Sequence, residues 1–233
     1  MVTTTYHSPL GDITLAADAQ GLTGLWFVGQ SHYGATLTGD ERSFDMQKGV
    51  FSAVEADSAA HDSPVVADEV IEGCDATSGG NPMRASDPQN TAAVSVLERA
   101  WAWLNAYFAG QAPRWTPPLR VEGTEFQHAV WVALLEVPYG QTVARGDLAR
   151  AVACRCGIAV PGNRDLDVDT SGHVGQGSHS VSSLERALDA AIEDNPIAII
   201  IPCHRVADEG RVLAKNSRSA EVKQALLKIE AAR

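Results

Sequence analysis

The feature that most limits how this chain can fold is a long acidic stretch, residues 34–90. It is rich in Asp, Ser, Gly, Ala and Asn and shows little sustained hydrophobic periodicity. Between residues 40 and 87, eleven acidic side chains stand against three basic ones. Such a composition buries too little apolar surface to offset the conformational entropy lost on folding. We therefore predict an acidic, largely disordered insertion over 34–90.

The same stretch decides how the net charge of −11 is interpreted. Residues 123–233 carry 12 Lys and Arg side chains against 14 Asp and Glu, so that half of the chain is almost neutral. A nearly neutral domain can still present a basic face. The overall acidity therefore does not exclude binding to nucleic acid.

Two folded parts are predicted around the insertion. Residues 2–28 contain β-branched and aromatic segments separated by turn signals, which is typical of short strands. Residues 91–109 repeat apolar side chains at helical spacing, with Asn90 as the expected cap and Gly110 as the end. We place a domain boundary near residue 120, after a proline-bearing connector.

The second part, residues 121–233, is predicted to be mostly helical. Thr124 and Gln127 have the spacing of a capping box at the start of a helix. The following "GDLARAVA" predicts a second short helix, so the pair is either a helix-turn-helix or an ordinary helical hairpin. Residues 153–181 are rich in Gly, Ser and Asp and predict a second insertion. Further helices are expected over 182–194 and 219–231, and a buried strand at "PIAIII" (196–201).

The composition also predicts where the protein works. No stretch approaches the ~20 apolar residues of a membrane span, and the first residues lack the basic and apolar regions of a signal peptide. The four cysteines do not form a disulfide framework, so we expect a reducing, cytoplasmic location and no membrane partner. The spacing of Cys154, Cys156, His173 and His179 is atypical of structural zinc, so no metal is expected.

One cysteine stands in a setting that suggests chemistry. Cys203 follows a proline and precedes His204 in "NPIAIIIPCHRV". A thiol is nucleophilic as its thiolate, and its unperturbed pKa is ~8.5, so it needs a base or a positive charge nearby. Glu230, on the last predicted helix, is a candidate to orient the imidazole. The alternative from these residues alone is a buried, inert cysteine.

Several motifs together resemble one family. "IPCHRV" resembles the active-site motif of the O6-alkylguanine-DNA alkyltransferases. "FQHAVWVALLEVPYGQT" is similar to the start of the family's DNA-binding domain, and "SPLGDITLAAD" with "GLTGLWFVG" to its N-terminal domain. The resemblance covers most of residues 2–33 and 91–233. It implies an α/β chain with a small ribonuclease-H-like N-terminal domain and a winged-helix-like DNA-binding domain that carries the cysteine.

The resemblance also implies roles for single residues. Cys203 matches the cysteine that takes an alkyl group from guanine O6 in one irreversible step. His204 matches the histidine that withdraws the thiol proton through a water, and Glu230 matches the glutamate that orients it. Asn195 matches the asparagine of the turn before the active site, and Arg186 the arginine that fills the gap left by the flipped base. The implied partner is double-stranded DNA containing O6-alkylguanine, bound by a monomer without a cofactor.

This chain departs from the family pattern in its guanine pocket. Arg145 stands where the family has a tyrosine, and Asn216 stands at a second tyrosine position. Ser217 remains as a hydrogen-bond donor for O6, whereas Asp189 replaces a common glycine in the recognition helix. Arg145 and Arg205 are candidates for contacts to DNA phosphates. The alternatives are therefore a lesion-binding protein with impaired transfer, or a thiol enzyme acting on a small substrate.

Overall fold

A sheet of five strands builds the N-terminal part of the computed structural model. The structure describes residues 1–30, 32–39, 41–48, 50–51, 88–158, 178–208, 211–212 and 217–232. The strands are β1 (Val2–Ser8), β2 (Gly11–Ala17), β3 (Leu22–Phe27), β4 (Arg42–Asp45) and β5 (Val50–Phe51). Their order in the sheet is β3-β2-β1-β4-β5, and the β1–β4 pair alone is parallel.

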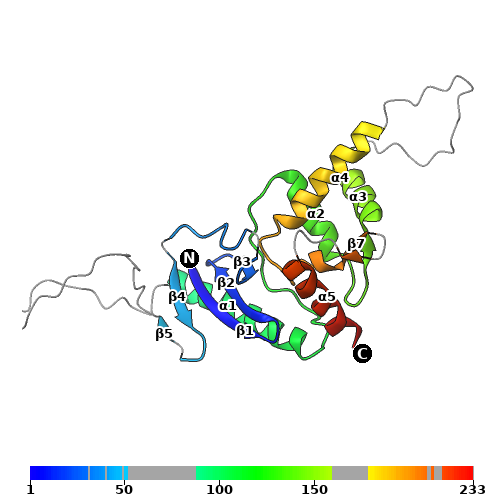
Figure 1. Cartoon of the computed structure of the whole chain (residues 1–233). Coiled ribbons are helices and arrows are strands. Elements are labelled where there is room, and N and C mark those ends of the chain that lie inside the picture. The colour runs from blue at the N-terminus through cyan, green and yellow to red at the C-terminus, as the bar shows by residue number, and fades with distance from the viewer. Residues whose placement is uncertain are drawn as a thin grey trace, which may run out of the picture.

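One face of this sheet is covered by α1 (Pro88–Phe108), as Figure 1 shows. Alternate side chains of β1, namely Val2, Thr4 and Tyr6, point inward and are buried, as the two-residue period of a strand requires. Leu97 and Leu104 of α1 are fully buried in the same core. The predicted β-rich domain and its helix are therefore confirmed.

The limits of the first predicted insertion need correction. β4 and β5 lie inside residues 34–90, and β4 hydrogen-bonds to β1. The sequence of β4, "RSFD", does not indicate a strand, because it has little apolar periodicity. The strand pairs through backbone hydrogen bonds. Helix α1 starts at Pro88, so Asn90 lies within the helix and is not its cap. Residues 52–87 lie outside the described part of the chain.

The C-terminal part packs helices around a small sheet. Its helices are α2 (Glu125–Leu135), α3 (Arg145–Arg155), α4 (Ser178–Glu193) and α5 (Ser217–Ala231). The strands β6 (Val143–Ala144), β7 (Val206–Asp208) and β8 (Arg211–Val212) follow the order β6-β7-β8. The predicted capping box is confirmed. The Thr124 side chain accepts a hydrogen bond from the backbone amide of Gln127, and the Gln127 side chain accepts one from the backbone amide of Thr124.

The second predicted insertion is shorter than expected at both ends. Helix α3 continues to Arg155 and closes through Cys156 and Gly157, which has a positive φ of 65°. Helix α4 already begins at Ser178. The part between, residues 159–177, lies outside the described residues. In the described ranges, no helix combines the length and apolar character needed to cross a membrane.

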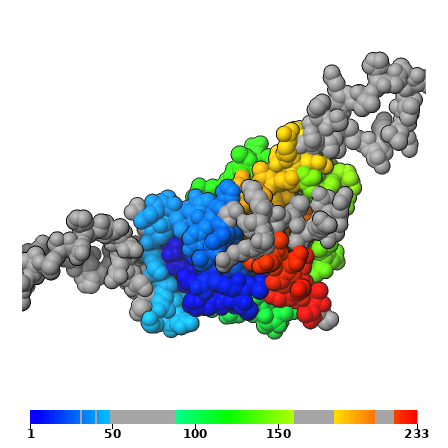
Figure 2. Space-filling model, in the orientation of Figure 1, coloured from blue at the N-terminus to red at the C-terminus, as the bar shows by residue number. Residues whose placement is uncertain are grey.

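The prediction of a strand over residues 196–201 is wrong. The segment is a buried turn that forms one isolated bridge, Ile197 to Leu25 of β3. The Leu25 amide donates to Pro196 O at 2.8 Å, and the Ala198 amide donates to Leu25 O at 2.9 Å. An aliphatic run does not distinguish a buried strand from a buried turn. The turn joins the two parts into one core, and Figure 2 shows their joined surface.

Candidate active site

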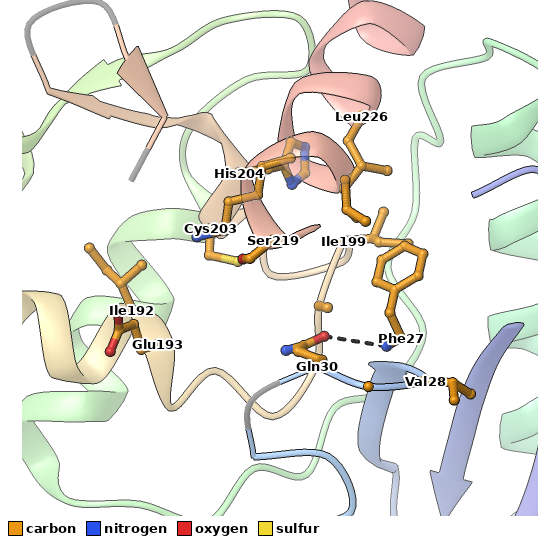
Figure 3. A pocket seen from close by; sticks show the side chains of 14 residues that line it. Phe27, Val28, Gln30, Ile192, Glu193, Ile199, Cys203, His204, Ser219 and Leu226 are labelled. Carbon is orange, nitrogen blue, oxygen red and sulfur yellow. Dashed lines mark hydrogen bonds between the residues drawn. The ribbon is translucent and has the colours of Figure 1, made fainter. Parts of the chain in front are cut away.

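Cys203 opens a single 3₁₀ turn, η1 (Cys203–Arg205), directly after the buried segment. It is 9% exposed and lines a pocket of about 760 Å³, a volume that includes the open mouth. Cys203 and His204 line one side of this pocket, and Phe27, Val28 and Gln30 lie on the other side (Figure 3). The thiol is therefore held at a partly apolar pocket that both parts of the chain build.

The turn that presents Cys203 is braced from inside. The Asn195 side chain donates to Ile201 O at 2.9 Å and accepts from the Ile197 amide at 3.0 Å. Between these contacts Ile199 adopts a φ of +67°, a conformation that β-branched residues rarely take. The buried side-chain amide of Asn195 thus holds a strained backbone in place, three residues before Pro202, the proline that precedes Cys203.

His204 is paired with Glu230 of α5. Nε2 of His204 lies 2.7 Å from Oε1 of Glu230, and both side chains are almost completely buried. Burial lowers the pKa of His204 below its usual value, while the hydrogen bond to Glu230 opposes that shift. The imidazole is therefore neutral near neutral pH and able to accept a proton. Its other nitrogen, Nδ1, has no hydrogen-bond partner among the described residues.

Glu230 is the centre of a buried polar network. Arg205 donates to it from Nε and from Nη2, each at 2.9 Å. Tyr107 of α1 and the backbone amide of Gly140 also donate, each at 2.9 Å. Burial alone would raise the pKa of Glu230, but the hydrogen bonds from His204 and Arg205 outweigh it and lower the pKa to about 2. Glu230 is therefore an anion whose charge stabilises a protonated His204.

Arg205 has a different role from the one predicted. It is buried, also donates from Nη1 to Val137 O at 2.7 Å, and lies over the Tyr139 ring at 5.6 Å. A guanidinium enclosed in this way does not reach a DNA phosphate. Sequence alone could not reveal the burial of Arg205, because a single arginine next to His204 belongs to no hydrophobic periodicity that would mark it as buried.

Comparison with known proteins decides the family. Residues 1–56 match the model of the "6-O-methylguanine DNA methyltransferase, ribonuclease-like domain", and residues 168–232 match that of the "6-O-methylguanine DNA methyltransferase, DNA binding domain". The methylated-DNA–protein-cysteine methyltransferase of Mycobacterium leprae is 34% identical over 143 residues, covering 61% of this chain and 68% of that protein. The chain belongs to the methylated-DNA–protein-cysteine methyltransferase family.

Two further relatives show the extent of the match. The enzyme of the same name from Methanosarcina acetivorans is 36% identical over 127 residues, covering 54% of this chain and 64% of that protein. This alignment thus spans slightly less than two thirds of the relative. The crystal structure of Mycobacterium tuberculosis OGT in complex with DNA has a TM-score of 0.58 and 26% identity, and the match covers 100% of this chain and 94% of that one.

The residues predicted to contact DNA in this methyltransferase-family chain differ in their exposure and in their partners. Arg186 is exposed on α4. Arg145, in contrast, forms a two-point ion pair with Asp189 of α4, with Nε–Oδ1 at 2.8 Å and Nη2–Oδ2 at 2.6 Å. Its guanidinium is thus engaged by a carboxylate within the protein, and a contact from Arg145 to a DNA phosphate stays a prediction. Asn216 lies outside the described residues, and Ser217 begins α5.

Three contributors to the site were not predicted from sequence. Tyr107 lies 123 residues from Glu230 along the chain, too far for a motif to connect them. Gly140 has a φ of +75°, which only glycine adopts without strain, and "PYG" is a signal that could have suggested it. Lys223 of α5 lines the pocket with Cys203. Within the described residues, no three potential ligands gather to hold a metal, and Cys154 and Cys156 are exposed at the end of α3.

Proposed function

We propose that this protein repairs DNA by transferring an alkyl group from O6 of guanine to Sγ of Cys203. The S–C bond forms as the O6–C bond breaks, so the product is a stable thioether and each molecule reacts once. The observation that carries the proposal is the pocket cysteine next to a neutral histidine that is hydrogen-bonded to a buried glutamate. No cofactor enters this reaction.

The proton of the thiol leaves through His204. Nδ1 is buried and has no partner among the described residues, whereas Nε2 is held by Glu230. A water molecule hydrogen-bonded to both Sγ and Nδ1 would carry the proton from the thiol to the ring. The Glu230 anion then stabilises the imidazolium, as the carboxylate does in other nucleophilic triads. The departing guanine takes up a proton at its ring, which completes the balance.

The partner in this proposal is double-stranded DNA that contains O6-alkylguanine. A base cannot react within the stack, so in this proposal it is extruded into the pocket. Arg186, which is exposed on α4, would then fill the gap that the base leaves. We propose a monomer, because one chain supplies the whole site. A cytoplasmic location follows from the need to keep Cys203, a free thiol, reduced.

The test is mass spectrometry after mixing the protein with duplex DNA that contains one O6-methylguanine. The Cys203 peptide should gain the mass of one methyl group, and the yield should stop at one equivalent. Cys203→Ala should show no transfer, whereas Cys156→Ala, which changes an exposed cysteine, should react normally. Transfer that persists in Cys203→Ala would refute the assignment.

One observation favours a second candidate, a lesion-binding protein with impaired transfer. Where the resemblance expects a tyrosine, the Arg145 side chain is paired with carboxylates and offers no aromatic face to a flipped base. Base–aromatic stacking contributes about 1–3 kcal/mol per base. Specific binding to the lesion duplex without methylation of Cys203 would favour this candidate over repair.

A further inference from the structure

Three side chains form a charge cluster where the start of α3 meets α4. Besides its two-point contact with Asp189, Arg145 donates from Nη1 to Glu185 at 3.3 Å. The Arg145 side chain is 18% exposed, and those of Glu185 and Asp189 are 34% and 38% exposed. We call these three residues the α3–α4 clamp.

The clamp has a clear electrostatic cause. Glu185 and Asp189 are four residues apart, so they are neighbours on one helix face and repel each other. The guanidinium of Arg145 lies against both and relieves that repulsion. Its planar fork also fixes the orientation of Asp189, because two parallel hydrogen bonds allow little rotation. The clamp therefore holds α4 in one orientation relative to α3.

Helix α4 connects the exposed face of the domain to the pocket. Arg186, next to Glu185, is exposed, and Ile192 and Glu193 at the end of the helix line the pocket with Cys203. On another side, the indole of Trp131 in α2 donates to Ala191 O at 2.9 Å. A rotation of α4 would thus move Arg186 and the pocket wall together.

We propose that Arg145 is a positioning residue, which acts through Asp189 and Glu185 to hold α4 in the orientation that transfer requires. This inference rests on the proposed function. Arg145 and Asp189 are both departures from the family pattern, and the clamp pairs them directly. Where the resemblance leads us to expect a tyrosine and a glycine, this chain has an ion pair between α3 and α4.

Two substitutions with opposite charge changes separate positioning from simple electrostatics. Arg145→Met and Asp189→Asn both break the clamp, but one removes a positive charge and the other a negative charge. If the clamp positions α4, both lower the transfer rate at saturating DNA, by roughly 3- to 30-fold if the coupling has the usual size. The double variant should be no slower than the slower single variant. If charge near the phosphates is what matters, Asp189→Asn should bind and react better.

A matched control and a second measurement complete the test. Arg150→Met makes the same change on α3, where Arg150 pairs with Asp147 at an exposed position, so its rate should stay normal. Hydrogen exchange of the α4 amides should rise in both clamp variants and not in this control. A charge-swapped variant, Arg145→Asp with Asp189→Arg, should restore part of the protection of the α4 amides and part of the transfer rate.

The outcomes separate this inference from the proposed function. Normal transfer in both single variants, or faster transfer in Asp189→Asn, would overturn the positioning role. If the unaltered protein transferred no alkyl group, the proposed function would fail. Hydrogen exchange alone would then test whether the clamp holds α4. Unchanged protection of the α4 amides in both variants would refute this role, and lost protection would support it.

Discussion

The hydroxyl of Tyr107 donates to Oε1 of Glu230 at 2.9 Å, across 123 residues of sequence. Tyr107 belongs to α1 of the N-terminal part and Glu230 to α5, and both are buried. Burial, and then the neighbouring Glu230 anion, raises the pKa of Tyr107, so the phenol keeps its proton and remains a donor. The N-terminal part thereby supplies one of the groups that stabilise the carboxylate behind His204.

Tyr107→Phe should lower the free energy of unfolding. The change removes one donor to a buried anion and leaves the packing almost intact, and a loss of about 1–3 kcal/mol is expected for such a contact. Urea unfolding measures it. Tyr33→Phe is the control, because Tyr33 is 44% exposed and its hydroxyl contacts Thr14 at 2.7 Å. Equal losses in the two variants would show that the Glu230 contact has no special importance.

Glu230→Gln should lower stability and flatten its dependence on pH. At neutral pH it leaves Arg205 buried without its anion, which typically costs about 3–5 kcal/mol. The folded-state pKa of Glu230 is about 2, below the usual 4.5. Its stabilisation is therefore fully present above pH 4.5 and is lost as the pH falls toward 2.

Unfolding in urea at a series of pH values measures this effect. The unaltered protein should lose more stability than Glu230→Gln does between pH 4.5 and 2. Glu221→Gln, an exposed substitution on the same helix, should leave the profile unchanged. Parallel profiles for the unaltered protein and Glu230→Gln would contradict the depressed pKa.

His204 should titrate below its unperturbed pKa of 6.5. Burial disfavours its charged form more than Glu230 favours it, so the folded protein takes up this proton at lower pH than the unfolded chain does. Its contribution to stability therefore falls as the pH drops below 6.5. An NMR titration of the His204 ring, with the urea-unfolded chain as reference, measures the shift. A midpoint at or above that of the unfolded chain would contradict it.

The parts of the fold that sequence could predict are those determined by neighbouring residues. Thr124 and Gln127 specify a capping box within four residues, and the spacing of Cys203, His204 and Glu230 is carried by motifs. Contacts between distant segments could not be predicted in the same way. The Arg145–Asp189 pair joins two elements 44 residues apart, and each residue alone is read as a departure from the family pattern.

The hydrophobic pattern predicted the wrong structure for one strongly apolar segment and missed one polar strand. The all-aliphatic segment 196–201 is predicted as a strand, but Asn195 and β3 use its backbone polar groups to form a turn. At the other extreme, the polar β4 carries too weak a pattern to be recognised, yet it pairs with β1. In both places backbone hydrogen bonds decided the structure, and they leave little trace in side-chain periodicity.

The corrected limits of the acidic stretch lead to a deletion experiment. Residues 57–87 contain seven acidic side chains and one basic one, and they follow the end of the match to the N-terminal domain at residue 56. Replacing them with a short flexible linker should leave thermal stability nearly unchanged, because this composition buries little apolar surface. Replacing residues 34–90 should destabilise the protein, because it removes β4 and the start of α1.

The shorter deletion should also strengthen DNA binding at low salt. It removes negative charge that repels phosphates, and the gain should shrink as salt shortens the reach of these charges to about 3 Å at 1 M. Fluorescence anisotropy with an unmodified duplex, measured over a salt series, tests this. A loss of folding in the 57–87 deletion would show that the acidic segment packs against the body of the protein. A gain in affinity that persists at high salt would show that the segment blocks DNA sterically.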